Sequence, residues 1–176
     1  DWVEYYCRVL GFDRLVHFDD DQISTQYAAL MSTVVWNHDS VVLPINEPAE
    51  GLRKSQIEEY LDYYRSPGVQ HIALRTADIV ATVRALRDRG VRFLTVPPEY
   101  YEDARERMAD VDLPWADLQE LGILVDRDRD GHLLQIFTEN VCDRPTVFFE
   151  IIQREGATGF GAGNCTALSV ATERAR

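Results

Sequence analysis

One helical pattern followed by three strand-like runs occupies the start of the chain. Apolar side chains recur at helical spacing from Trp2 to Leu10, and Gly11 follows, so a helix is predicted there with its C-terminal cap at the glycine. Runs rich in β-branched and aromatic residues predict strands at 14–18, 23–37 and 40–45. The expected order is therefore a helix and then three strands.

A second helix is predicted to connect the two halves of the chain. Ser55 and Glu58 have the spacing of a capping box, in which each side chain bonds the backbone N–H of the other residue. An apolar stripe with helical spacing follows and ends at residues 66–68, Ser-Pro-Gly, where proline and glycine stop a helix.

Helices interrupt the strand patterns of the second half. An amphipathic helix is predicted at 79–89, and the charged stretch 98–121, which contains Pro114, is predicted to be a helical insertion. The Asp130-Gly131 pair predicts a hairpin turn, because such turns need a residue that accepts positive φ. Strands are predicted at 69–74, 91–96, 123–126, 132–137 and 146–153.

The order of these elements predicts an α+β fold built from two repeated modules. The second half is interpreted as a βαβββ unit with the insertion before its third strand, and the first half as the same unit without its opening strand. We expect residues 1–66 to be the truncated first module with its connecting helix, and 67–155 to be the second module. Residues 156–176 are expected to be a glycine-rich loop and a C-terminal helix.

Composition excludes several kinds of partner. The chain has 176 residues and 45% hydrophobic content, enough to bury one sizeable core. Thirty acidic residues against 18 basic ones give a formal net charge of -12, which repels nucleic acid and anionic membranes. We therefore expect neither partner.

The cysteines favour a reducing compartment, and we expect a cytoplasmic protein. Cys7, Cys142 and Cys165 are widely spaced and include no CxxC pair, so neither a disulfide framework nor a structural zinc site is indicated. No apolar run approaches the roughly 20 residues that span a bilayer. Because the chain opens with Asp1 rather than Met, we expect its N-terminus to be a cut.

Five segments of the chain resemble one enzyme family, and the similarity runs in order over essentially the whole sequence. They are Leu43–Pro48, Gly68–Leu74, Leu133–Thr138, Asp143–Arg154 and Gly159–Asn164. These segments closely resemble parts of 4-hydroxyphenylpyruvate dioxygenases, whose C-terminal catalytic domain has the vicinal oxygen chelate fold. In that fold, paired βαβββ modules curl their sheets around a metal site, which matches the predicted order of elements.

The resemblance implies an Fe(II) site in which His71 and Glu150 are two protein ligands. In the family, two histidines and one glutamate hold the metal and leave positions open for substrate and O2. A strand histidine alone is usually structural. Glu150, however, lies in an apolar strand, where an unpaired buried carboxylate costs several kcal/mol and requires a partner.

The third ligand is expected to be a histidine upstream of Asp1, because the matching family strand precedes the first helix. The other histidines of the chain do not replace it. His17 is predicted on a different strand, His38 in a turn, and His132 beside the hairpin turn.

Alternation along the strands extends a cavity face from these ligands. Phe148 shares the face of Glu150, and Gln135 shares a face with Phe137. The resemblance implies catalytic roles for Gln135, Asn46 and Ser32, and substrate-binding roles for Gln56, Gln70, Pro44, Phe137, Phe148, Phe160 and Asn164.

The implied activity converts 4-hydroxyphenylpyruvate and O2 to homogentisate and CO2 in tyrosine catabolism. Cys165 replaces a phenylalanine of the family, and the closely related hydroxymandelate synthases also look less aromatic there. A hydroxymandelate synthase acting on the same substrate is therefore one alternative, and a metal-free binding module is another. The full-length protein is expected to form a homo-oligomer.

Three further features carry no predicted chemistry. Tyr100 and Tyr101 are expected to pack at the start of the insertion, and Cys142 has no neighbouring histidine in sequence that would activate it. Residues 126–130 resemble a calcium loop in composition, but the chain lacks the combination of a glycine at the sixth position and a glutamate at the twelfth that such a loop needs.

Overall fold

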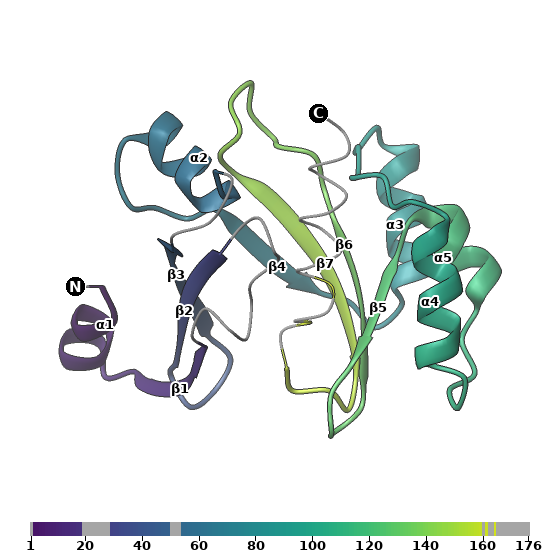
Figure 1. Cartoon of the computed structure of the whole chain (residues 1–176), viewed down its shortest axis with the longest axis horizontal. Coiled ribbons are helices and arrows are strands. Elements are labelled where there is room, and N and C mark those ends of the chain that lie inside the picture. The colour runs from purple at the N-terminus through teal and green to yellow at the C-terminus, as the bar shows by residue number, and fades with distance from the viewer. Residues whose placement is uncertain (1, 19–28, 50–53, 160, 162–163, 165–176) are drawn as a thin grey trace. The chain divides into compact units, whose positions relative to one another are not determined.

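The strands of the chain form a three-stranded sheet in the order β1-β2-β3 and a four-stranded sheet in the order β4-β7-β6-β5 (Figure 1). The computed structural model describes residues 2–18, 29–49, 54–159, 161 and 164. The chain divides into two units, Asp1–Asp62 and Tyr63–Arg176, and each contains one of the sheets. Mixed helix and sheet of this kind confirm the predicted α+β class.

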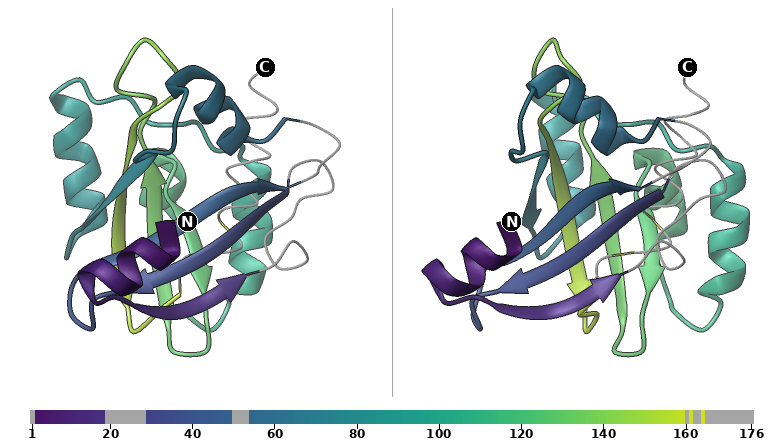
Figure 2. Two further views of the ribbon diagram at one scale, coloured as in Figure 1. Left: turned by 90° about the vertical axis from the view of Figure 1, so that its left-hand side faces the viewer. Right: turned by 60° about the vertical axis from the view of Figure 1, so that its left-hand side comes forward.

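The first unit follows the predicted order of a helix and three strands. It contains α1 (Trp2–Leu10), β1 (Asp13–Phe18), β2 (Ala29–Trp36) and β3 (Val42–Ala49), and both strand pairs are antiparallel. Helix α1 lies beside this sheet (Figure 2). The predicted strand 23–37 is confirmed at 29–36, and its first part, up to residue 28, lies outside the described residues.

Strand β3 runs further than its two prolines led us to expect. The predicted strand ended at residue 45, whereas β3 continues to Ala49 through Pro48. Because β3 is at the edge of the sheet, Pro44 and Pro48 can remain in the strand without removing a hydrogen bond from a ladder on both sides.

The predicted capping box is present at the start of α2 (Gln56–Tyr64). The Ser55 N–H donates to Glu58 Oε2 at 2.7 Å, and the Glu58 N–H donates to Ser55 Oγ at 3.2 Å. The two residues therefore satisfy two backbone donors that the first turn of a helix leaves without partners.

The second unit is a βαβββ module with two inserted helices. Its elements are β4 (His71–Arg75), α3 (Ile79–Asp88), α4 (Glu99–Arg107), α5 (Trp115–Leu121), β5 (Leu124–Arg127), β6 (His132–Phe137) and β7 (Phe148–Glu155). Strand β4 is parallel to β7, and the other pairs are antiparallel. The hairpin predicted at Asp130-Gly131 joins β5 to β6.

The strand predicted at 91–96 is wrong, and the position of the insertion changes with it. Only Phe93 forms a β-bridge, to Thr138, and the segment then reaches Pro97 and Pro98, which have no N–H to donate. Too few backbone partners are therefore available to make a strand. The insertion precedes β5, the second strand of the module, and not the third strand.

The core of the second unit lies between the sheet and its helices. Val125, Leu134, Ile136 and Ile151 pack with residues of α3, α4 and α5 in one buried cluster. The three helices lie together along one side of the sheet (Figure 1). Because side chains alternate along a strand, the residues between these core positions face away from the helices. No helix within the described ranges is long and apolar enough to cross a membrane.

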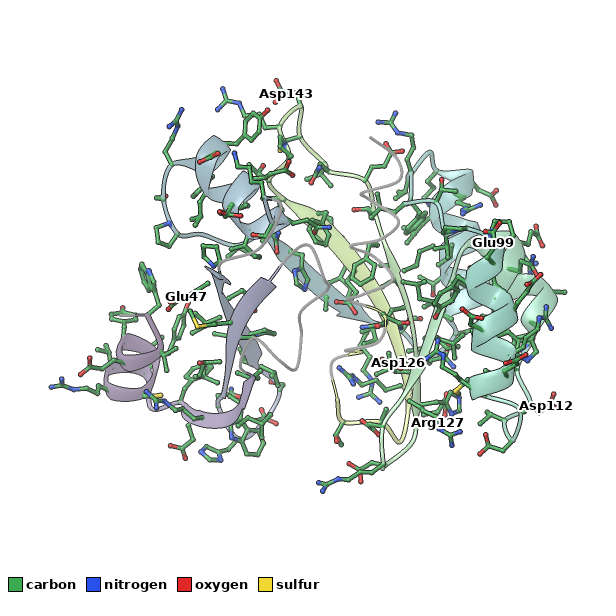
Figure 3. The ribbon with its side chains drawn as sticks, in the orientation of Figure 1. Glu47, Glu99, Asp112, Asp126, Arg127 and Asp143 are labelled. Carbon is green, nitrogen blue, oxygen red and sulfur yellow. The ribbon has the colours of Figure 1, made fainter. Side chains whose placement is uncertain are left out.

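The inserted helices are fastened to the edge strand β5. Arg127 donates to both carboxylate oxygens of Asp110, at 2.7 and 3.0 Å, and Figure 3 shows Arg127 on β5 beside the loop that carries Asp112. The Val125 N–H donates to the Tyr100 hydroxyl at 2.8 Å. The insertion therefore covers an edge that would otherwise expose unpaired backbone groups.

Candidate metal and substrate site

Strand register in the second unit brings several predicted site residues onto one face of the sheet. His71 on β4 pairs with Phe148 on β7, and Glu150 on β7 pairs with Phe137 on β6. Gln135 lies two residues before Phe137 and shares its face. The register agrees with the shared face that alternation predicts for these residues, and this face is turned away from the helices.

His71 and Glu150 form a close pair that is not hydrogen-bonded. Nε2 of His71 lies 3.6 Å from Oε2 of Glu150, too far for a hydrogen bond. Burial lowers the pKa of the His71 imidazole below its ordinary value, so the ring is neutral at pH 7 and has a lone pair free for a ligand. The side chain of Glu150 is only 7% exposed.

The carboxylate of Glu150 is buried, so its charged form loses the favourable free energy of hydration. Burial raises the pKa of its carboxyl to about 6, although the hydrogen bond from Gln135 and the charge of Arg154 lower it. The carboxylate is therefore mostly ionised at pH 7, yet it lies where water is largely excluded. A cation close to Oε2 would offset this desolvation.

The pair fits two ligands of one Fe(II) ion. Two donor atoms at right angles, each about 2.1 Å from a metal, are about 3 Å apart, so a small movement of either side chain from 3.6 Å suffices. A neutral imidazole and a carboxylate also match the donor types of non-haem iron sites. Within the described residues, no group of three His, Cys, Asp or Glu side chains could hold a metal ion.

Two phenylalanines line the face next to this pair. The Phe148 ring stacks on the His71 ring with a centroid distance of 5.1 Å and an interplanar angle of 11°. The Phe137 ring meets Phe148 edge to face at 6.1 Å. These rings restrict the orientation of the imidazole and present an aromatic surface beside it.

Gln135 connects Glu150 to the segment after β7. Its Nε2 donates to Glu150 Oε1 at 2.6 Å, and its Oε1 accepts from Asn164 Nδ2 at 2.8 Å. All three side chains are buried. Gln135 therefore occupies one oxygen of Glu150, while the other oxygen is the one near His71.

The remaining predicted site residues lie in several places. Ser32 and Asn46 are register partners across β2 and β3 of the first unit, and Pro44 is exposed on the same strand as Asn46. Gln56 is the first residue of α2. Gln70 precedes β4, where its carbonyl accepts from the Phe148 N–H at 3.1 Å. Phe160, Cys165 and the predicted C-terminal helix beyond Asn164 lie outside the described residues.

The other histidines have different surroundings. Nε2 of His38 lies 2.7 Å from a carboxylate oxygen of Asp13 at an exposed position of the first unit. His132 begins β6, next to the hairpin turn. The side chain of His17 is not among those described.

Sequence reasoning missed three residues that support the site. Tyr100, which we expected only to pack, donates to Asn164 Oδ1 at 2.9 Å. Gly161 has φ of +70°, and a Cβ atom there would lie 2.2 Å from Gln135 Oε1. Asp128 accepts four backbone N–H bonds, two of them from Thr158 and Gly159. Only Gly161 had a signal, as a glycine in a glycine-rich loop.

The comparison with protein families identifies the superfamily. Residues 1–136 match the model of the Glyoxalase/Bleomycin resistance protein/Dioxygenase superfamily. This chain belongs to that superfamily. Its four-stranded βαβββ unit, with one antiparallel and one mixed sheet in the chain, agrees with the vicinal oxygen chelate class predicted above.

Within the superfamily, the chain is similar to curated 4-hydroxyphenylpyruvate dioxygenases. It is 51% identical over 185 residues to the protein from Yarrowia lipolytica, covering 99% of this chain and 47% of that protein. It is 52% identical over 177 residues to the protein from Dictyostelium discoideum, covering 98% and 48%. The chain thus spans about half the length of the curated relatives it matches.

A solved structure has a closely similar fold. It is a triple mutant of 4-hydroxymandelate synthase from Streptomyces coelicolor, with a TM-score of 0.85 and 39% sequence identity, covering 98% of this chain and 49% of that one. A fusion protein of a xylose isomerase-like TIM barrel with a 4-hydroxyphenylpyruvate dioxygenase matches with a TM-score of 0.74 and 27% identity, over 99% of this chain and 27% of the fusion.

Proposed function

We propose that the protein containing this chain is an Fe(II)-dependent dioxygenase that converts 4-hydroxyphenylpyruvate and O2 to homogentisate and CO2. The observation that carries the proposal is the pair of His71 and Glu150, 3.6 Å apart beside two phenylalanines. The pair occurs in a chain about half identical to curated enzymes with this name.

His71 and Glu150 would hold the iron. When bound, Fe(II) supplies the redox chemistry that couples the reduction of O2 to the loss of CO2 from a 2-oxo acid. A histidine upstream of Asp1 is predicted as the third protein ligand. The neutral ring of His71 and the buried carboxylate of Glu150 need no proton rearrangement at pH 7 before they accept a metal.

The chain's other side chains on this face would orient the substrate. Phe148 and Phe137 present ring faces and edges that suit the aryl group of an arylpyruvate. Gln135 holds one oxygen of Glu150, which limits the directions in which the carboxylate can coordinate. The substrate roles predicted for Ser32, Asn46, Pro44, Gln56, Gln70, Phe160 and Asn164 stay predictions.

A second candidate, 4-hydroxymandelate synthase, is favoured by two observations. The solved structure with a TM-score of 0.85 is described as such an enzyme, and Cys165 departs from the phenylalanine of the dioxygenases. The two enzymes differ in which carbon of the same substrate is hydroxylated. The product therefore decides between them.

We also propose that the protein works in a reducing compartment such as the cytoplasm. Cys7 and Cys142, the two cysteines among the described residues, are both free thiols. This supports a setting in which disulfides do not form. The expected homo-oligomer stays a prediction.

The test compares this chain with a version extended N-terminally through the predicted third ligand. Bound iron, O2 consumption with 4-hydroxyphenylpyruvate and the product by chromatography are measured for both. Iron binding with homogentisate as the product in the extended version supports the dioxygenase, and 4-hydroxymandelate supports the synthase. If neither version binds iron or consumes O2, the metal-free binding module is the better interpretation.

A further inference from the structure

A continuous series of hydrogen bonds runs from the inserted helix α4 to Glu150. Tyr100 donates to Asn164 Oδ1 at 2.9 Å, Asn164 Nδ2 donates to Gln135 Oε1 at 2.8 Å, and Gln135 Nε2 donates to Glu150 Oε1 at 2.6 Å. The four residues come from α4, the segment after β7, β6 and β7. Asn164 is 0% exposed and Gln135 is 3% exposed, so water does not compete for these bonds.

The direction of each bond in the series follows from the atoms that face one another. Gln135 turns its NH2 group toward Glu150 Oε1 and its oxygen toward the NH2 group of Asn164. Asn164 must then turn its own NH2 group toward Gln135 and its oxygen toward Tyr100. The Tyr100 hydroxyl lies 2.9 Å from that oxygen and is in position to donate its proton to it.

The Tyr100 hydroxyl is itself fixed by the edge of the sheet. It accepts from the Val125 N–H at 2.8 Å, and its single proton is shared between the Val125 carbonyl oxygen at 2.8 Å and Asn164 Oδ1 at 2.9 Å. Val125 is on β5, whose outer edge has no neighbouring strand among the described residues. Burial raises the pKa of the Tyr100 phenol, although its backbone contact with Val125 lowers it, so the proton stays on the oxygen at neutral pH. The hydroxyl therefore has a fixed position, and it keeps the one proton that it shares between the Val125 carbonyl oxygen and Asn164 Oδ1.

We propose that Tyr100 is a positioning residue for the metal ligand Glu150. Through Asn164 it holds the Gln135 amide with its NH2 group toward Glu150 Oε1, which leaves Oε2 as the oxygen beside His71. The inference that this arrangement serves a metal rests on the proposed function. The inference that Tyr100 positions the Gln135 amide does not depend on the proposed function.

A purely structural role for Tyr100, as a cap for the edge of β5, is the alternative to exclude. Tyr100→Phe removes both the cap and the donor to Asn164, whereas Asn164→Leu leaves the bonds between Tyr100 and Val125 intact and breaks only the connection to Gln135. Tyr101→Phe is the matched control. The Tyr101 hydroxyl is the neighbouring buried phenol and has no hydrogen-bond partner among the described residues.

The first measurement uses the metal-free chain labelled with 15N. The side-chain NH2 resonances of Gln135 are assigned by their loss in Gln135→Leu. We expect Tyr100→Phe and Asn164→Leu to shift these resonances and to speed their exchange with water about tenfold, while Tyr101→Phe leaves them unchanged. Unchanged Gln135 resonances in a folded Tyr100→Phe protein would overturn the proposal. If Tyr100→Phe does not fold, the result with Asn164→Leu decides in the same way.

The second measurement is the binding of Co(II), used as an air-stable probe of the Fe(II) site, in the N-terminally extended protein. We expect Tyr100→Phe to weaken binding about tenfold and to shift the visible absorption of the bound ion. In a Gln135→Leu background, Tyr100→Phe should add nothing further, because the series is already broken. If Tyr100→Phe weakens Co(II) binding equally in the parent protein and in the Gln135→Leu background, Tyr100 does not act on the metal site through Gln135, and the link to the metal is overturned. If the parent protein itself binds no Co(II), the proposed function fails, and the amide resonances still decide whether Tyr100 positions Gln135.

Discussion

The Nε2 atom of His71 lies 3.6 Å from the Oε2 atom of Glu150, although the two residues are far apart in the sequence. The parallel pairing of β4 with β7 creates this proximity, because it places Ala73 opposite Glu150 and His71 one pair further along the same face. The two side chains thus meet diagonally across neighbouring strands, at a spacing that long side chains can bridge.

This relationship predicts that each of the two residues is needed to bind Fe(II). Because partners outside the coordination sphere already change affinity by about 10- to 100-fold, His71→Ala and Glu150→Ala should each weaken binding by at least about 100-fold. Competition with a chelator of known affinity measures the change in the extended protein. His38→Ala, at an exposed position of the first unit, is the matched control and should leave affinity unchanged. Wild-type affinity in either site variant would remove the residue from the ligand set.

Gly161 should tolerate a side chain poorly because of Gln135. An alanine Cβ would lie 2.2 Å from Gln135 Oε1, and φ is +70°. Gly11 has φ of +71° with no atom within 4 Å of such a Cβ, so Gly11→Ala measures the backbone strain alone, about 1 to 2 kcal/mol. We expect Gly161→Ala to lower the free energy of unfolding by about 1 to 3 kcal/mol more than that. Urea unfolding of both variants gives the difference in their free energies of unfolding. If both variants lose the same free energy of unfolding, the Gln135 side chain moves aside without a measurable loss of stability.

The loop after β7 should be released by acid through Asp128. Burial raises the pKa of this carboxyl, but the N–H donors of Gly159, Asp130, Thr158 and Gly131 lower it more, so the pKa is below 3.8. Since the folded-state pKa is the lower one, the carboxylate stabilises the loop above about pH 3.8, and this contribution is lost as pH falls through the folded value.

Hydrogen exchange of the Thr158 and Gly159 amides measures this effect. Asp128→Asn should speed their exchange about tenfold at pH 5 and remove the additional acceleration seen below pH 3.8 in the parent chain. Asp112→Asn, at an exposed position between α4 and α5, is the control. It should change neither the exchange rate at pH 5 nor the acceleration below pH 3.8. Protection that persists in Asp128→Asn would mean that other contacts hold the loop.

The two adjacent tyrosines of α4 should respond to the same substitution with opposite signs. The Tyr101 hydroxyl is buried without a hydrogen-bond partner among the described residues, so Tyr101→Phe should raise the free energy of unfolding by about 1 kcal/mol. Tyr100→Phe leaves Val125 N–H and Asn164 Oδ1 without their partner and should lower it by about 1 to 3 kcal/mol. Thermal and urea unfolding of both variants check the signs.

Local sequence patterns predicted most of the secondary structure correctly. The Ser55 and Glu58 capping box, the Asp130-Gly131 hairpin and helix 2–10 each depend on residues within a few positions of one another. The strand predicted at 91–96 was wrong because a strand also depends on residues that are distant in the sequence. Its composition suits a strand, but a strand exists only where a neighbouring chain offers a row of backbone partners, and only Phe93 finds a β-bridge.

By itself, the sequence determined the fold class, the superfamily resemblance and the identity of His71 and Glu150 as candidate ligands. Alternation also determined which neighbours share their face. Only the tertiary structure decided that Tyr100 reaches Glu150 through Asn164 and Gln135, and that a missing Cβ at Gly161 leaves room for Gln135. Those contacts join residues from four separate elements. Their distances depend on how strands and helices pack, which no local pattern of apolar and polar positions encodes.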